Sequence, residues 1–158
     1  MTAADEPASP VRLRPVDREP LDAVLNLRCA DGQEANTNDY TWALLQAAYW
    51  YGGAAKMYAV CAGDTVVGRI RLDDTPDCHS FTDLLIDRAH QRRGYAEAAV
   101  REAVRLFRCG GKHSRVSIFV AEDNAAAIAL YRKCGFTETG RCDPDVPQLR
   151  EYALALAD

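Results

Sequence analysis

Apolar residues recur along this chain with two periods, and each period predicts a type of element. Alternation of apolar and polar positions indicates strands at residues 11–14, 57–61, 66–72, 80–86, 115–120, 137–141 and 149–156. Spacings of three and four indicate helices from an N-cap at Asp17 to about residue 28, and at residues 40–51, 94–108 and 124–133. Residues 1–10 are polar and proline-containing, which predicts a mobile tail before a single domain at 11–158.

The order of these elements predicts an α/β fold with a mixed sheet. The strand–helix–strand unit at about residues 81–120 implies one right-handed parallel crossover. The other strands are joined by short turns and are expected to pair antiparallel. We therefore expect a mostly antiparallel sheet of six or seven strands with helices on both faces.

Composition narrows the classes of function. The chain has 158 residues, 48% of them hydrophobic, and a net charge of -4, which fits one globular domain and not a basic nucleic-acid-binding protein. No apolar run reaches the ~18 residues of a membrane span, and no signal-peptide pattern opens the chain. The six cysteines form no CxxC pair and have no accompanying histidine pair, so we expect free thiols in the cytoplasm and no metal site.

The segment 91–96, Gln-Arg-Arg-Gly-Tyr-Ala, joins an apolar strand to an amphipathic helix. Free N–H groups at a helix N-terminus bind anions, and Gly94 has no side chain to obstruct their approach. Arg92 and Arg93 add positive charge, so the segment is a candidate cradle for a pyrophosphate. The alternatives are a plain strand-to-helix turn or a dinucleotide-binding turn, although the latter needs two further glycines and a position near the first strand.

A second candidate segment begins at Asn124, which is expected to cap a short helix. Asn124, Ala127, Leu130 and Tyr131 share roughly one helical face, and Gly135 ends the helix before Phe136. An ordinary amphipathic helix with a half-buried tyrosine would have the same pattern. The combination of this segment with the cradle, in this order, is more specific than either alone.

Together these segments resemble the GCN5-related N-acetyltransferase (GNAT) superfamily over nearly the whole chain, from Val11 to Leu156. The matching positions are Leu85, Ile86, Asp87, Gln91, Arg92, Arg93, Gly94, Tyr95, Ala96, Asn124, Ala127, Leu130, Tyr131, Gly135 and Phe136. The cradle has the family's Q/R-x-x-G-x-G/A form.

The resemblance implies that acetyl-CoA is the cosubstrate and that two central parallel strands splay apart to admit its pantetheine arm. The arm would pair with the main chain of Leu84, Leu85 and Ile86, beside Asn124 and Ala127. Tyr131 would protonate the departing thiolate. The pyrophosphate would lie in the cradle formed by Gln91, Arg92, Arg93, Gly94, Tyr95, Ala96 and Glu97. Small homodimers are common in this family.

This sequence lacks the general base that one branch of the family has. That branch has a glutamate five residues before the asparagine, and this chain has Phe119 there. Asp83 is the first candidate base. Glu122 and His79 are the second choices, with action through water as one route for them. A salt-bridged or solvated carboxylate is the alternative for Asp83, and a surface-loop role is the alternative for His79.

Carboxylates in the segments expected to face the amine acceptor favour a cationic substrate. A polyamine or aminoglycoside-like amine is slightly favoured over a protein N-terminus or a lysine. The residues are Glu34, Asp39, Asp73, Asp74 and Asp77, the last three in a predicted loop, with Trp42, Tyr49, Trp50 and Tyr51 as candidate pocket walls. The acidic loop could instead serve solubility, and the aromatic residues could belong to the core. A non-catalytic acyl-CoA-binding regulatory module and a ligand-free scaffold remain as alternative functions.

Overall fold

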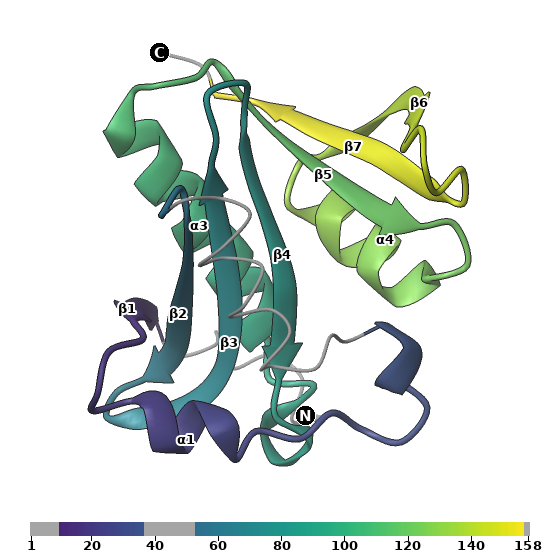
Figure 1. Ribbon diagram of the computed structural model, residues 1–158. Coiled ribbons are helices and arrows are strands. Elements are labelled where there is room, and N and C mark those ends of the chain that lie inside the picture. Colours follow the sequence, from purple (N-terminus) through teal and green to yellow (C-terminus); the bar gives the residue numbers. More distant parts are fainter. Residues whose placement is uncertain (1–9, 37–52, 157–158) are drawn as a thin grey trace, which may run out of the picture.

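The computed structural model describes residues 10–36 and 53–156, which form a seven-stranded sheet with the order β1-β2-β3-β4-β5-β7-β6 (Figure 1). The predicted helix at 40–51 and most of the predicted tail lie outside the described residues. The strands are β1 (Val11–Pro15), β2 (Ala55–Ala62), β3 (Thr65–Asp74), β4 (His79–Ile86), β5 (Arg115–Ala121), β6 (Thr137–Cys142) and β7 (Leu149–Ala155). The helices are α1 (Leu21–Leu25), η1 (Glu34–Asn36), η2 (Arg88–His90), α3 (Tyr95–Gly110) and α4 (Ala125–Lys133).

Strand pairing confirms the predicted mixed sheet. β4 and β5 are parallel and are connected through α3, whereas every other neighbouring pair is antiparallel. Apolar residues spaced at three and four along α3 face the sheet, and Val100 and Ala103 are fully buried there. The predicted α/β fold class is thus confirmed, and the period of the apolar residues is the reason it could be predicted.

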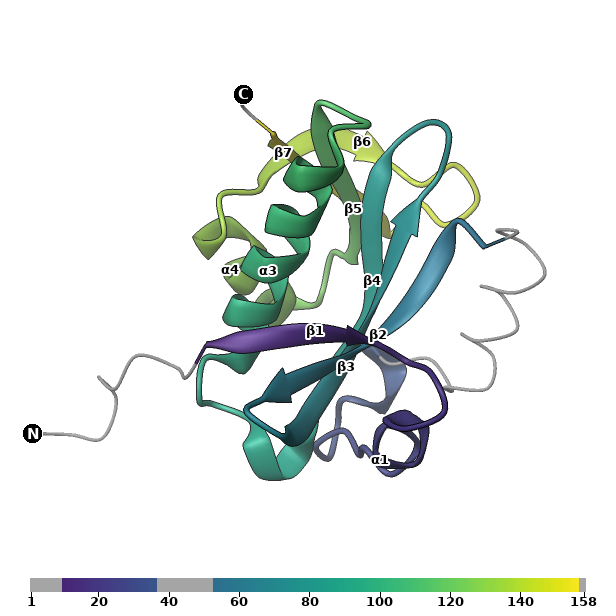
Figure 2. The same ribbon diagram turned by 90° about the vertical axis from the view of Figure 1, so that its left-hand side faces the viewer.

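Helices cover both faces of the sheet, as expected. α3 and α4 lie on the same side (Figure 2), where α3 packs on residues such as Ile70 and Phe81. On the opposite side a smaller cluster joins Val24 and Leu27 to Met57. Within residues 10–36 and 53–156, no helix combines the length and the apolar composition needed to cross a bilayer.

The first helix is shorter than predicted. α1 spans only Leu21–Leu25, and its N-cap is Pro20, not Asp17. The Asp17 carboxylate instead accepts a hydrogen bond from the Glu19 N–H at 3.2 Å, which forms a turn ahead of the helix. Val24 is completely buried, so tertiary packing holds this short helix in place.

The predicted polar loop at residues 73–77 is a loop only from Thr75 onward. β3 continues through Asp73 and Asp74, which pair with Ser80 and His79 of β4. Side chains alternate along a strand, so the two carboxylates point to opposite faces of the sheet. The sequence argument failed because aspartate is rare in strands, whereas here both carboxylates have cationic partners.

The two parallel strands diverge over most of their length (Figure 1). Their register contains a single pair, His79 with Val116, at the start of both strands. From there towards Ile86 and Ala121, β4 and β5 separate. This splay matches the expectation from the resemblance and leaves main-chain groups of both strands facing each other across a gap.

Candidate active site

The cradle segment has a backbone conformation that favours anion binding. Gly94 is the N-cap of α3 with φ 77° and ψ 4°, and Arg92 has φ 61°, so two left-handed residues flank Arg93. The first helical hydrogen bond runs from the Ala98 N–H to the Gly94 carbonyl at 3.0 Å. The N–H groups that precede it at the helix start have no intrahelical acceptor, and they point outward at the positive end of the helix dipole. The residues present therefore fit a pyrophosphate.

Side chains on both sides of the cradle fix its loop to the end of β4. The Gln91 amide donates to the Ile86 carbonyl at 3.0 Å and to Gln33 Oε1 at 2.9 Å. The Asp87 carboxylate accepts from the Ala89 N–H at 2.9 Å and from the Arg28 N–H at 2.8 Å. Burial alone would raise the pKa of Asp87, but these backbone hydrogen bonds outweigh it and lower that pKa. Gln91 thus braces the cradle through its side chain.

The second motif segment lies beside the cradle helix on the same side of the sheet. Asn124 is the N-cap of α4, and its Oδ1 accepts from the Ala127 N–H at 3.2 Å. At the other end of α4, Lys133 contacts the Glu97 carboxylate at 2.7 Å. This ion pair connects the first turn of α3 to α4, because Glu97 points its side chain towards α4.

Tyr131 is partly buried and packs against aromatic side chains of the core. Its ring centroid lies 5.6 Å from that of Phe81 on β4 and 6.1 Å from that of Phe136, with both pairs tilted edge to face. Burial disfavours the phenolate and raises the pKa of Tyr131 to about 12. The phenol therefore stays protonated at neutral pH and is available as a proton donor next to the splayed strand β4.

Asp83 lies at a bulge in β4, where the strand accommodates one residue more than β3. Arg69 pairs with Leu85 and Arg71 with Thr82, so the single residue between them on β3 opposes two residues of β4. Asp83 has φ 52°, a conformation that aspartate tolerates better than most residues. Its side chain is only 1% exposed, and its Oδ2 lies 3.6 Å from the Arg71 guanidinium.

Arg71 also holds Asp73 in a bidentate pair. Arg71 Nε lies 2.8 Å from Asp73 Oδ1, and Arg71 Nη2 lies 3.1 Å from Asp73 Oδ2. Burial raises the pKa of Asp73, and the neighbouring Arg71 partly opposes this shift. One guanidinium thus serves two buried carboxylates, on the face of the sheet opposite Tyr131. The sequence argument missed Arg71, although a charged residue inside an apolar strand pattern was a usable signal.

The two second-choice bases lie elsewhere. Glu122 follows β5, is exposed, and pairs with Arg150 at 3.0 Å. His79 is buried at the paired start of β4, where its ring stacks on Phe107 with centroids 4.5 Å apart. The alternative of a surface-loop role for His79 is wrong, because β4 begins one residue earlier than the apolar pattern predicted.

The candidate acceptor residues do not form one patch. Asp73 and Asp74 face opposite sides of the sheet. Glu34 in η1 and Asp77 in the loop between β3 and β4 are exposed. Five further candidates lie outside the described residues: Asp39, Trp42, Tyr49, Trp50 and Tyr51.

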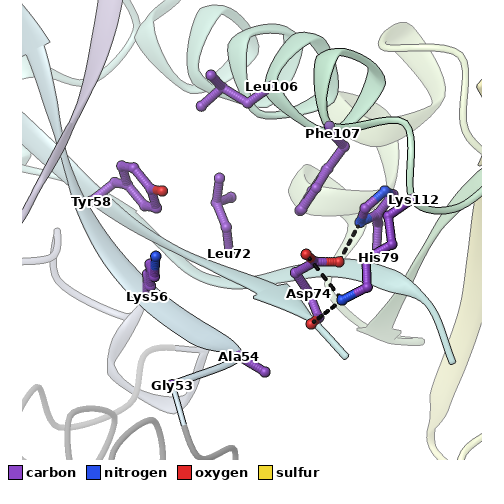
Figure 3. A pocket seen from close by; sticks show the side chains of 11 residues that line it. Gly53, Ala54, Lys56, Tyr58, Leu72, Asp74, His79, Leu106, Phe107 and Lys112 are labelled. Atoms are coloured by element: carbon purple, nitrogen blue, oxygen red, sulfur yellow. Dashed lines mark hydrogen bonds and ion pairs between the residues drawn. The ribbon is translucent and has the colours of Figure 1, made fainter. Parts of the chain in front are cut away.

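A hollow of about 410 Å³ lies at the paired end of the sheet, between β2, β3 and the last turns of α3 (Figure 3). Leu72, Leu106 and Phe107 form its apolar wall. At one edge Asp74 contacts His79 at 3.0 Å and Lys112 at 3.3 Å. No sequence pattern predicted this site, because its residues come from separate segments.

Comparison with known proteins agrees with this geometry. The model of the acetyltransferase (GNAT) family matches residues 21–136. No curated protein matches the sequence significantly. Among solved structures, a spermidine N-acetyltransferase from Vibrio cholerae in complex with CoA and spermine aligns with a TM-score of 0.73 at 19% identity, covering 94% of this chain and 96% of that one.

A spermidine/spermine N-acetyltransferase from Vibrio cholerae in complex with manganese ions aligns with a TM-score of 0.71 at 19% identity, covering 96% of this chain and 95% of the other. At identities this low, the structural likeness shows a shared fold and nothing more. The family match covers most of the chain and includes the cradle, the bulged strand and the tyrosine helix. This protein therefore belongs to the acetyltransferase (GNAT) family.

Proposed function

We propose that this protein transfers the acetyl group of acetyl-CoA to a primary amine of a polyamine. The observation that carries the proposal is the divergence of β4 from β5 directly beside the left-handed Gly94 at the start of α3. A pantetheine arm needs unpaired strand edges, and a pyrophosphate needs free N–H groups. Here both lie at the same end of the sheet.

Acetyl-CoA supplies an activated thioester, and the protein's own groups bind and orient it. The N–H groups of Tyr95, Ala96 and Glu97, with the exposed Arg92 and Arg93, hold the diphosphate. The main chain of Leu84, Leu85 and Ile86 binds the amide groups of the arm in the manner of an added strand. Asn124 and Ala127 line the other side of the path. Tyr131 donates the proton that the departing sulfur requires.

The proton leaving the amine goes to Asp83, through a water molecule. The Asp83 side chain lies on one face of β4, with Arg71, and Tyr131 packs against Phe81 on the other face. The acid and the base therefore lie on opposite sides of the strand. We expect Asp83→Asn to lower kcat/KM by about 10²-fold or more, with little change in acetyl-CoA affinity. Asp64→Asn, which changes an exposed carboxylate in the turn between β2 and β3, is the matched control. An unchanged kcat/KM in Asp83→Asn would exclude Asp83 as the base.

A polyamine is favoured over other amines for two reasons. The chain is acidic overall, with a net charge of -4, and Glu34 in η1 and Asp77 in the loop before β4 are exposed carboxylates. The solved structures with the same fold include enzymes named for spermidine acetylation. A long cation gains from several separated carboxylates, whereas a protein N-terminus presents one charge.

Thiol release from acetyl-CoA, with mass spectrometry of the products, tests the proposal directly. Spermidine and spermine are compared with an aminoglycoside, a lysine peptide and a free N-terminal peptide. We expect the polyamines to give the highest kcat/KM and acetylated products. If no amine raises thiol release although CoA binds, the protein is a non-catalytic CoA-binding module. Preference for the lysine peptide would overturn the choice of acceptor.

Gly94→Glu tests the cradle separately from the acceptor. A side chain at a left-handed helix start, with a negative charge facing the diphosphate, should weaken CoA binding by about 100-fold or more. Wild-type protein at 100 times its Kd should gain about 2.7 kcal/mol of stability from CoA, and the variant should gain almost none. Arg108→Glu adds a glutamate at the exposed C-terminal end of α3 and should bind CoA normally. Equal CoA binding by wild type and Gly94→Glu would refute this location.

A further inference from the structure

Three potential metal ligands converge at the paired end of the sheet, away from the cradle. Asp74 ends β3, His79 begins β4, and His113 lies between α3 and β5. One ligand atom from each lies within 4.8 Å of the others. The chain contains only three histidines, and two of them meet here.

The contacts at this point leave two buried polar atoms with little compensation. Asp74 Oδ1 and His79 Nδ1 are buried and lie 3.0 Å apart, and neither has a further hydrogen-bond partner among the described residues. His79 as a whole is 2% exposed and is held between Phe107 and the ring of His113. Each of these atoms has only the other as a close partner, and an ion bound between them would give both of them a further one.

We propose that Asp74, His79 and His113 bind a zinc ion that connects the β3–β4 hairpin to the loop after α3. Two imidazoles and one carboxylate are typical zinc ligands, whereas magnesium and calcium prefer oxygen alone. Zinc bonds of ~2.0–2.1 Å in tetrahedral geometry place ligand atoms about 3.3 Å apart. The observed separations from Asp74 Oδ1 are 3.0 Å to His79 Nδ1 and 3.9 Å to His113 Nε2, which bracket that value.

Zinc binding requires small rearrangements of two hydrogen bonds. His113 Nε2 lies 2.8 Å from the Thr75 carbonyl oxygen, and this contact gives way to the metal. His79 Nε2 accepts a long hydrogen bond of 3.3 Å from the His113 N–H, which is lost when the His79 proton moves from Nδ1 to Nε2. Two single hydrogen bonds are weak compared with coordination to a zinc ion. The released Thr75 carbonyl or a water molecule takes the fourth position.

An outer contact of the site orients the Asp74 carboxylate. The second oxygen of Asp74 faces Lys112 Nζ at 3.3 Å, which orients the carboxylate so that Oδ1 points towards His79 (Figure 3). The site lies beside the hollow at the end of α3, so solvent reaches it from one side. A bound zinc would fasten three segments at the end of the sheet where β4 and β5 still pair.

Zinc titration of the full chain, followed by competition with a chelator, tests the site. Cys109 and Cys142 are exposed thiols, so all proteins carry Cys109→Ser and Cys142→Ser. We expect one zinc per chain and a cobalt derivative with the visible absorption of tetrahedral coordination. His113→Gln and Asp74→Asn should each weaken zinc binding by about 100-fold or more.

His90→Gln is the matched control, because His90 lies in η2 at the opposite end of β4. Thermal melts in chelator establish that each variant folds, and zinc should raise the melting temperature of the parent protein and of His90→Gln but not of His113→Gln. Absence of zinc binding in the parent that lacks the two exposed thiols would overturn the proposal. Equal zinc affinity in that parent and in His113→Gln would overturn it as well.

Discussion

Strands β3 and β4 present an apolar face to α3 and a charged face to the other side of the sheet. On the first face Ile70 and Phe81 pack against α3, with Tyr131 as a polar group at its edge. On the second face Arg71 holds Asp73 and Asp83 with little exposure to solvent. Both faces are buried, yet different forces hold them together.

The two faces differ in how much their residues are expected to contribute to folding stability. Burial of apolar side chains stabilises the face under α3 directly. Burial of charges costs desolvation energy, and replacing a buried ion pair by apolar residues is often neutral or stabilising. A charged cluster at the bulge of β4 is therefore better explained by a role in positioning Asp83 than by a contribution to folding.

The largest expected effect comes from removing the acid on the apolar face. Tyr131→Phe keeps the ring and its contacts with Phe81 and Phe136 but removes the proton donor. We expect kcat to fall by about 10² to 10⁴-fold, with little change in acetyl-CoA affinity. Steady-state kinetics and equilibrium CoA binding measure the two quantities. An unchanged kcat would show that the tyrosine only fills space on this face.

Arg71→Met tests the charged face. Loss of the guanidinium leaves Asp73 and Asp83 buried without this partner, and we expect the free energy of unfolding to fall by about 3–5 kcal/mol. Urea denaturation measures it. Arg101→Met, which removes an exposed ion pair on α3, should cost far less. Equal losses in the two variants would mean that the charged cluster is open to solvent.

The loss of folding stability at alkaline pH tests whether the phenol of Tyr131 is buried on the apolar face. The folded pKa of Tyr131 is about 12, above the ~10 of an exposed phenol, so burial favours the neutral form. The stability associated with this group is fully present below pH ~10 and is lost as the pH rises towards 12, in total about 2–3 kcal/mol. Unfolding measured across this range should show a steeper decline for wild type than for Tyr131→Phe. Parallel curves would indicate an exposed phenol.

Sequence patterns were reliable where a short segment carries its own signal. The 3.6-residue period of α3, the glycine at its start and the asparagine before α4 all lie within single elements, and the structure has each element in its expected place. Predictions were wrong where ion pairs with residues of other segments outweighed the low strand preference of a residue type. The aspartates of β3 are unfavourable in an isolated strand, but Arg71 and Lys112 provide partners that no local rule includes.

The sequence by itself determined the order of elements, the anion-binding turn and the presence of a tyrosine helix, because each depends on spacing along the chain. Only the tertiary structure decided which charges meet. Asp83 joins Arg71 from the neighbouring strand, and Asp74 joins His79 and His113 from three segments. Such contacts depend on strand register and on the packing of the sheet against α3, where a shift of one residue would send each side chain to the opposite face.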